Sequence, residues 1–325
     1  MSKKVSTAEL RLIQFLHCLP LFCVMAFATA ITWLASWLPV SWVSAHRDVL
    51  LNQLICFPER SWKENRRHAR RALVQTARTL AGYSHVWLRP EAQAMGRIKE
   101  IVGVAAVREA MNSNRPVLFL SLHQAAWEVP VLVIGEIGQA VVMYQPAVDS
   151  ALDPVVKEAR ERTGCKLVPA DGRGVRTALG ALDQGGTFGL LADHQPGGKS
   201  NPCADFFGHA VPVPAFVHKV ISRYKPAIFY VHAEYKKSDR YYDVHFVPAA
   251  AEMYDADEQT TLNEMMKGLE AIIRRAPDQY NWTYNRFRRG EQGKRDWYKK
   301  KKAMLLIERI RSGERAADVF VDSQG

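Results

Sequence analysis

The chain has 325 residues, of which 48% are hydrophobic and 24% are charged, and its formal net charge is +11. This composition is ordinary for a globular protein with some membrane character, and the length allows one large domain or two modest ones with a sizeable core. The positive charge indicates an acidic partner, such as an anionic membrane surface or an acidic carrier protein. The sequence has no recognisable groove-reading motif and no Gly-x-Ser-x-Gly elbow, which argues against a nucleic-acid-binding protein and against a serine hydrolase.

The cysteines indicate neither disulfides nor a metal site. Their number is odd, and the sequence lacks the Cys-x-x-Cys and Cys/His spacings that are typical of metal ligation. We therefore expect unpaired thiols in a reducing compartment, no bound metal and no cofactor. The residues are Cys18, Cys23, Cys56, Cys165 and Cys203.

The N-terminal region carries a strong membrane signal. Between Leu12 and Ala45 there is no Lys, Arg, Asp or Glu, whereas about 20 apolar residues suffice to span a bilayer. Trp33, Trp37 and Trp42 are typical of an aromatic belt at the membrane interface. This pattern predicts a membrane anchor, either a transmembrane or a membrane-embedded helix, and the alternative is a buried core helix.

The anchor is expected to occupy residues 1–46. More basic residues follow the apolar run than precede it, so the positive-inside rule places the rest of the protein on the cytoplasmic face of the inner membrane. Two helices with a break at Pro58 are expected next, the second with Ser61 as N-cap and Glu64 at the capping-box position. The arginine cluster within 66–71 could contact anionic lipid or form a solvated helix face.

From residue 100 onward, β-rich runs alternate with helical stretches. This alternation predicts an α/β domain over 47–290, with a mixed, mostly parallel central sheet flanked by helices and antiparallel additions at one edge. A basic, helical C-terminal tail is expected over 291–325. The predicted strands are 117–122, 140–144, 187–192, 227–234 and 242–247. The predicted helices are 125–136, 151–163, 174–184, 214–224 and 258–276.

His123 and Glu128 are polar residues within an otherwise core-like stretch. His123 follows an apolar strand, and sites in open α/β sheets form at the carboxyl ends of strands. Five residues turn a helix by about 500°, so the two side chains would not share one helix face. A strand end at His123 followed by a helix would let Glu128 fix the tautomer of the ring and leave the other nitrogen free to accept a proton. The alternative is a satisfied core histidine with an exposed helix carboxylate.

Asp193 and His194 lie at a second predicted strand end, ahead of a Pro-Gly turn that contains Gly197. They could belong to the same site or form an ordinary β-turn.

Six segments of the chain follow one another in an order that is typical of one family. They are NQLICFPERSWKENRR, HQAAWE, YQPAVDSALDPVVKEARERTG, LADHQPGG, FFGHAVPVPAF and PDQYNWTYNRFRRG. Over residues 10–290 the chain resembles the late acyltransferases of lipid A biosynthesis, the lauroyl- and myristoyl-transferring type within the wider glycerolipid-acyltransferase-like group. Members of that family carry acyl chains from acyl carrier protein to hydroxyls on a saccharolipid.

The resemblance implies a role for several residues. His123 would be the general base on the acceptor hydroxyl, and Glu128 would orient it and stabilise its charge. Arg162 would hold the thioester or the developing oxyanion, or else would be a surface arginine. Asp193 and Gly197 would shape the site. Arg286 and Arg288 could bind phosphates of the acceptor. The alternative is that they form a solvated basic end of the domain.

The chain departs from the family pattern at three places, which concern the acceptor more than the chemistry. The family usually has Asn at the position of Ala126, Arg at that of Gln145, and a His-Arg-Arg run where this chain has Tyr284, Asn285 and Arg286. A lipid A precursor is the expected acceptor, and acyl carrier protein, or possibly acyl-CoA, the expected donor. A different specialised lipid, such as an aryl-polyene-type lipid, and a catalytically silent lipid-binding scaffold stay open as alternatives.

Overall fold

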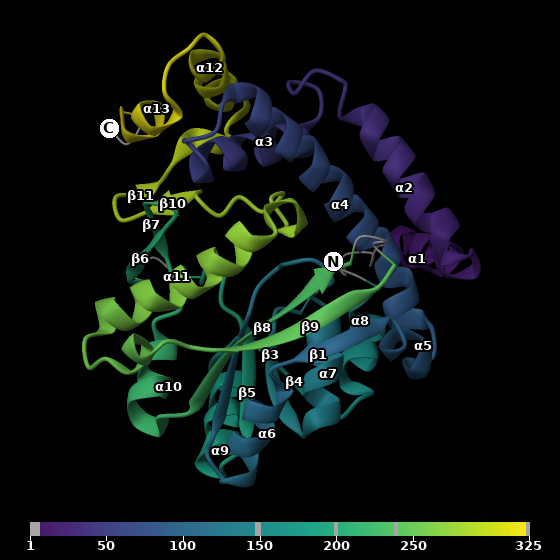
Figure 1. Ribbon diagram of the computed structural model, residues 1–325, viewed down its shortest axis with the longest axis vertical. Coiled ribbons are helices and arrows are strands. Elements are labelled where there is room, and N and C mark those ends of the chain that lie inside the picture. Colours follow the sequence, from purple (N-terminus) through teal and green to yellow (C-terminus); the bar gives the residue numbers. More distant parts are fainter. Residues whose placement is uncertain (1–6, 147–150, 198–200, 237–239, 323–325) are drawn as a thin grey trace, which may run out of the picture.

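A seven-stranded sheet lies at the centre of the computed structural model, which describes residues 7–146, 151–197, 201–236 and 240–322 (Figure 1). The strand order is β1-β9-β8-β2-β5-β3-β4. The strands from β8 to β4 are parallel, whereas β1 and β9 run the opposite way at one edge, which confirms the predicted mixed, mostly parallel sheet. The strands are β1 (Ile98–Val102), β2 (Val117–Ser121), β3 (Ala140–Tyr144), β4 (Lys166–Pro169), β5 (Thr187–Leu191), β8 (Ala227–Tyr235) and β9 (Tyr242–Pro248).

Alternate residues of the central strands supply two hydrophobic cores, one on each face of the sheet. In β2, Leu118 and Leu120 belong to one core, and Val117 and Phe119 belong to the other. All four side chains are buried because helices cover both faces, as a parallel sheet requires. The helices around the sheet are α6 (Val104–Asn112), α7 (Val129–Ile137), α8 (Asp153–Glu161), α9 (Gly172–Asp183), α10 (Phe216–Tyr224) and α11 (Glu258–Arg275).

The apolar N-terminal run is not one continuous helix. It is divided among α1 (Ala8–Cys18), α2 (Leu21–Ala35) and the start of α3 (Ser44–Cys56). Pro20 separates α1 from α2, since proline lacks an N–H donor and holds the residue before it extended, as Leu19 is with ψ 153°. With 15 residues, α2 is about 22 Å long, shorter than the ~30 Å hydrocarbon layer. Within the described ranges no helix is both long and apolar enough to cross a membrane, so the predicted transmembrane helix is not found.

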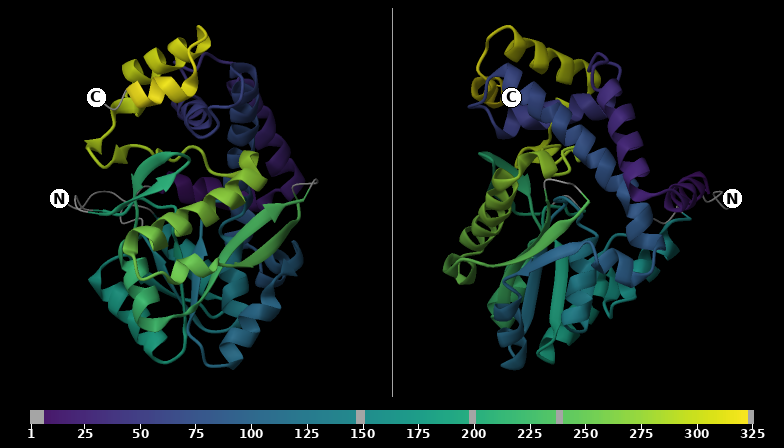
Figure 2. Two further views of the ribbon diagram at one scale, coloured as in Figure 1. Left: turned by 60° about the vertical axis from the view of Figure 1, so that its left-hand side comes forward. Right: turned by 45° about the vertical axis from the view of Figure 1, so that its right-hand side comes forward.

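The long helix α4 (Trp62–Leu88) supports the N-terminal helices. Ser61 and Glu64 form the predicted capping box, in which the Ser61 hydroxyl accepts from the Glu64 backbone N–H at 3.3 Å and the Glu64 carboxylate accepts from the Ser61 backbone N–H at 2.9 Å. The predicted break at Pro58 lies between α3 and α4. Both α2 and α3 pack against α4 (Figures 1 and 2), which is followed by α5 (Glu91–Met95).

The C-terminal segment completes the core. After the short strands β10 (Arg289–Gly290) and β11 (Gly293–Lys294), α12 (Lys300–Arg311) and α13 (Ala316–Asp322) lie against α3 (Figure 2). Apolar side chains of both helices are buried in the same core as those of α3, so this basic segment is not a free tail. The remaining elements are β6 (Cys203–Phe206), β7 (His209–Pro212) and the 3-10 helices η1 (Ala251–Tyr254), η2 (Pro277–Gln279) and η3 (Asp296–Tyr298).

Candidate active site

The pairing of two neighbouring strands brings His123 and Asp193 together. β2 runs parallel to β5, and Ser121 lies opposite Leu191 at the end of both strands. His123 and Asp193 each come two residues after that pair, so both leave the sheet at its carboxyl edge. Ligands of open α/β sheets bind at this edge.

Asp193 holds the imidazole of His123 by its Nδ1 atom. The distances from Nδ1 to the carboxylate oxygens Oδ1 and Oδ2 are 3.0 and 3.1 Å, and the His123 backbone N–H donates to Oδ2 at 3.0 Å. The hydroxyl of Tyr280 also donates to Oδ2, at 2.9 Å. A carboxylate only accepts, so Nδ1 carries the proton and Nε2 keeps a lone pair. Asp193 is fully buried, but 24% of the His123 side chain is exposed, which leaves the ring accessible.

His123 and Asp193 stabilise each other's charged form. Burial lowers the pKa of His123, but the charge and hydrogen bond of Asp193 raise it more, and the pKa lies above its ordinary value. Burial raises the pKa of Asp193, but the charge of His123 and the hydrogen bonds that the carboxylate accepts outweigh burial and hold this pKa below its ordinary value. Asp193 is therefore ionised, and the ring is prepared to take up a proton.

The carboxylate of Glu128 faces Arg160 rather than the ring of His123. Arg160 donates to it twice, from Nε to Oε2 at 2.7 Å and from Nη2 to Oε1 at 2.5 Å, and Trp87 Nε1 donates a third hydrogen bond at 3.2 Å. The carboxylate that fixes the histidine tautomer is therefore Asp193, and the sequence-based expectation that Glu128 contacts the ring is wrong.

A left-handed residue redirects the chain between His123 and Glu128. Ala125 has φ 47°, and its N–H donates to the carbonyl of Gln279 at 2.8 Å. The helix α7 then begins with Glu128 as its N-cap, on the side of α4 and α8. Burial raises the pKa of Glu128, but the charge and hydrogen bonds of Arg160 lower it by more. The pKa therefore lies below its ordinary value, and Glu128 is ionised. Its charge raises the pKa of His123 from a distance.

Arg160 and Arg162 lie close in sequence but bind different partners. Arg162, predicted to bind substrate, donates to the backbone carbonyls of Arg89 at 3.0 Å and Val86 at 2.9 Å, at the C-terminal end of α4. Two residues turn a helix by about 200°, so only one of the two arginines can face Glu128. Sequence reasoning missed Arg160, whose only signal is a cation on the amphipathic helix α8.

Aromatic side chains enclose the His123 ring. Trp127 meets it edge-on with ring centroids 5.3 Å apart, and Tyr284 stacks on it at 6.4 Å and 28°. Tyr284 also stacks on His194 at 5.8 Å, and its hydroxyl accepts from the Gln195 backbone N–H at 2.9 Å. The Asp193–Gln195 turn is thus joined to the segment after η2, and Tyr284 forms part of the wall of the site.

Arg286 is a buried cation beside this site. It is 1% exposed, and its Nη2 donates to the carbonyl of Pro212 at 3.0 Å. Its Nε and Nη1 are buried without a hydrogen-bond partner among the described residues. Burial lowers the pKa of Arg286. The pKa of His194 is lowered by burial first, and the charge of Arg286 lowers it as well.

Gly197 lies in an exposed turn, where the side chain of Asn201 donates to its carbonyl at 2.8 Å. Among the described residues, nothing lies within 4 Å of the position that a Cβ of residue 197 would take, so none of them requires glycine there.

A separate group of possible metal ligands lies on β8 and β9. Ligand atoms of His232, Glu234 and His245 lie within 4.8 Å of one another, and the two rings stack with centroids 4.9 Å apart. Burial lowers the pKa of His232 to about 3, so this ring is neutral, as a metal ligand must be. Arg275 Nε lies 3.0 Å from Glu234 Oε2, however, which places a cation on the carboxylate of the set. A metal would have to displace Arg275, and we assign none.

A buried carboxylate that fixes the tautomer of an accessible histidine is typical of enzymes that use histidine as a general base on a hydroxyl. The comparison with known families makes the class more specific. The chain belongs to the bacterial lipid A biosynthesis acyltransferase family, which it matches over residues 7–289. This confirms the resemblance seen in its motifs, and the chain is an acyltransferase that moves groups other than aminoacyl groups.

The relatives are distant but extend over most of the chain. The lipid A biosynthesis myristoyltransferase of Escherichia coli K12 is 23% identical over 79% of this chain and 80% of its own length. The palmitoleoyltransferase of the same organism is 24% identical over 76% of this chain and 80% of its own length. The lipid A biosynthesis lauroyltransferase of the same organism is 23% identical over 74% of this chain and 78% of its own length.

Proposed function

We propose that this chain is an O-acyltransferase that moves a fatty acyl chain from acyl carrier protein to a hydroxyl of a lipid A precursor. The observation that carries the proposal is the His123–Asp193 pair, in which Asp193 holds Nδ1 and leaves Nε2 unprotonated. Family membership supports acyl transfer, and the printed names of the relatives support a lipid A acceptor.

In the proposed reaction, His123 moves one proton. Nε2 takes the proton of the acceptor hydroxyl while the oxygen attacks the carbonyl carbon of the thioester, and the negative charge passes to the carbonyl oxygen. The tetrahedral intermediate collapses, the carbon–sulfur bond breaks, and the leaving sulfur receives the proton from Nε2. The products are an oxygen ester and a free thiol, and the histidine returns to its starting state.

The neighbouring charges support this step. Asp193 stabilises the imidazolium that forms transiently, and Glu128 adds a second negative charge at longer range. Arg286 is buried, so we propose that it favours an anionic substrate through its charge, which reaches Asp193 and His194, rather than through direct contact. We give Arg162 a structural role at the end of α4.

We further propose that the enzyme works at the cytoplasmic surface of the inner membrane. The first two helices and the turn after them expose many large apolar side chains, as an interfacial anchor does. The net charge of +11 supports attraction to anionic lipids and to an acidic carrier protein. The exposed side chains are those of Leu12, Phe15, Phe22, Phe27, Ile31, Trp33, Leu34, Trp37, Leu38 and Trp42.

The test of the reaction is acyl transfer by the purified full-length chain. Wild type and His123→Ala are assayed with an acyl carrier protein thioester and a lipid A precursor, and the products are identified by mass. We expect His123→Ala to lower kcat by about 10²- to 10⁴-fold, because the general base is lost.

His218→Ala is the matched control, since His218 lies on α10 and bonds to Thr261 and Ser222. Its rate should equal that of wild type. Transfer at the wild-type rate by His123→Ala would refute the assigned base, and lipid binding without transfer by wild type would identify a scaffold.

A further inference from the structure

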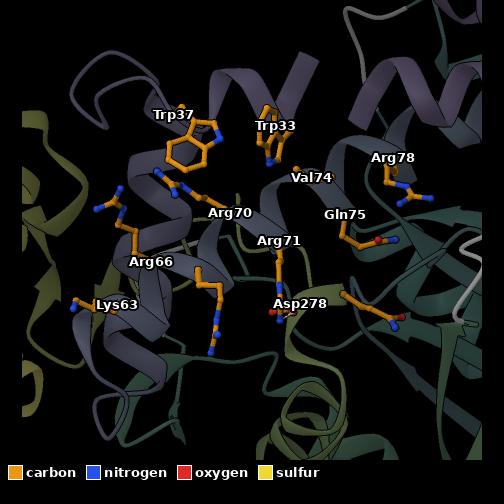
Figure 3. A pocket seen from close by; sticks show the side chains of 12 residues that line it. Trp33, Trp37, Lys63, Arg66, Arg70, Arg71, Val74, Gln75, Arg78 and Asp278 are labelled. Atoms are coloured by element: carbon orange, nitrogen blue, oxygen red, sulfur yellow. Dashed lines mark ion pairs between the residues drawn. The ribbon is translucent and has the colours of Figure 1, made fainter. Parts of the chain in front are cut away.

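A basic groove lies between α2 and α4 (Figure 3). Its volume is about 710 Å³. Trp33 and Trp37 form one wall, the basic face of α4 forms the floor, and Asp278 of η2 lies opposite the tryptophans. Gln279 also lines the groove. The cationic residues of the lining are Lys63, Arg66, Arg67, Arg70, Arg71 and Arg78.

Only part of this positive charge is neutralised within the protein. The carboxylate of Asp278 lies 2.6 Å from His68 Nδ1 and 3.9 Å from Arg71 Nη1. Lys63, Arg66 and Arg67 are exposed and make no hydrogen bond or ion pair within the part of the chain that the structure describes. The groove therefore holds an excess of cations that an anionic ligand would complement.

The shape of the groove is fixed by contacts between α2 and α4. The guanidinium of Arg70 lies over the ring of Trp37, 4.0 Å from its centroid, and Arg70 Nε donates to the carbonyl of Ser36 at 3.2 Å. These contacts of Arg70 hold the tryptophan wall against the floor of the groove, so no ligand is needed to form it. On the floor, Lys63 and Arg66 stay available to a ligand (Figure 3).

The groove lies where apolar and charged surfaces meet. Trp33 and Trp37 are 51% and 58% exposed at its rim, and the exposed apolar side chains of α2 continue from them. Tryptophan favours the headgroup level of a bilayer, and arginine binds phosphate oxygens through paired donors. This order of side chains matches a phospholipid, with its phosphate among the arginines and its chains along α2.

We propose that the groove binds the phosphate headgroup of an anionic membrane phospholipid and thereby sets how the enzyme is oriented on the bilayer. The inference rests on the proposed membrane location and specifies which face meets the lipid. The groove also adjoins the candidate active site, because Gln279 lines it and accepts from the Ala125 N–H, and Tyr280 donates to Asp193. A lipid bound there would place the bilayer beside His123.

The test is cosedimentation of the full-length chain with vesicles that contain no acceptor. Wild type and the double variant Arg66→Gln/Arg67→Gln are compared on vesicles of phosphatidylethanolamine with phosphatidylglycerol and on vesicles of phosphatidylcholine alone. Two basic residues near an anionic surface contribute about 1 kcal/mol each, so we expect the double variant to bind phosphatidylglycerol vesicles about thirtyfold more weakly. On phosphatidylcholine the two proteins should bind equally.

Arg108→Gln/Arg176→Gln removes the same charge from exposed positions on α6 and α9, at the other end of the molecule (Figure 1). Since charges more than a Debye length from the lipid are screened, this control should lose less than about threefold. Equal losses in both double variants, or no loss in the groove variant, would overturn the proposal. So would unchanged vesicle binding with a raised KM for the acceptor, which would assign the groove to an acceptor phosphate.

Acyl transfer in detergent micelles separates this inference from the proposed function. If wild type transfers no acyl chain in micelles, the proposed function fails. Vesicle cosedimentation still tests whether the groove binds anionic phospholipid. If the groove variant transfers at the wild-type rate in micelles but binds vesicles weakly, both proposals are supported.

Discussion

The protonation of His123 can be tested through Asp193. In the proposed reaction Nε2 must be neutral, so the rate should rise as the pH rises through the pKa of His123, which Asp193 holds above its ordinary value. Asp193→Asn removes the negative charge and lowers this pKa, so we expect the rise to move to lower pH. The plateau of kcat/KM should fall by about 10²- to 10⁴-fold because the imidazolium loses its partner. The pH profile of kcat/KM measures both effects.

Tyr280→Phe is the control for the shift. It keeps the charge of Asp193 and removes one hydrogen bond to the carboxylate, so its profile should move much less. An Asp193→Asn profile that rises at the same pH as that of wild type would contradict the assigned pair.

Glu128 is tested through its buried partner. Glu128→Ala leaves the Arg160 guanidinium without its anion, and we expect the free energy of unfolding to fall by about 3 kcal/mol. The lower end of the usual range applies because 20% of the Arg160 side chain is exposed. Glu128→Ala/Arg160→Met should recover most of the loss, as urea unfolding would show. A lower rate for Glu128→Ala with unchanged unfolding would instead assign Glu128 a purely chemical role.

The sequence indicated the position of the proposed base but not its partner. His123 was predicted at a strand end, and Asp193 at another, but 70 residues separate them. Their contact depends on β5 lying beside β2, although β3 and β4 come between these strands in the chain. The strand order of a sheet cannot be predicted from a local sequence pattern. Glu128 was chosen because it is near His123 in sequence, and the left-handed Ala125 turns it away.

Elements with a strong periodic pattern were predicted well, whereas edge elements were missed. The central strands and the helices between them were found because helices cover both faces and make the strands apolar throughout. The edge strands β1 and β4 were missed because the first carries Lys99 and Glu100 and the second has four residues ending at Pro169. The apolar N-terminal run was predicted as a single helix, but Pro20 divides it, and within the described residues no helix is long and apolar enough to cross a membrane.

The C-terminal helices are expected to stabilise the fold. Phe320 of α13 is buried against Trp297, with ring centroids 5.1 Å apart. Phe320→Ala should lower the free energy of unfolding by about 3–5 kcal/mol, because it leaves a cavity in the shared core. Leu305→Ala, at an exposed position of α12, should change it by less than about 0.5 kcal/mol. Equal unfolding midpoints in urea for the two variants would show that α13 does not contribute to the core.

Across the whole molecule, segments far apart in sequence meet next to the carboxyl edge of the sheet. The helix α4 contacts η2, and α3 contacts α12 and α13 (Figures 1 and 2). The Trp87 side chain of α4 donates a hydrogen bond to Glu128. The exposed apolar helices and the basic groove are therefore built on the same helix that supports the candidate site. If the groove binds lipid as proposed, orientation on the membrane and access to His123 are linked through α4.

The strand order also bears on when the His123–Asp193 pair can form during folding. β3 pairs with β5 and not with β2, so β5 must insert between two strands that precede it in the chain. Non-local parallel pairing of this kind forms slowly, after helices and local contacts. Until β5 is in place beside β2, Asp193 cannot reach His123, so the charged pair forms only when these strands pair. If His123 is the base as proposed, activity should return during refolding no earlier than the closing of the sheet.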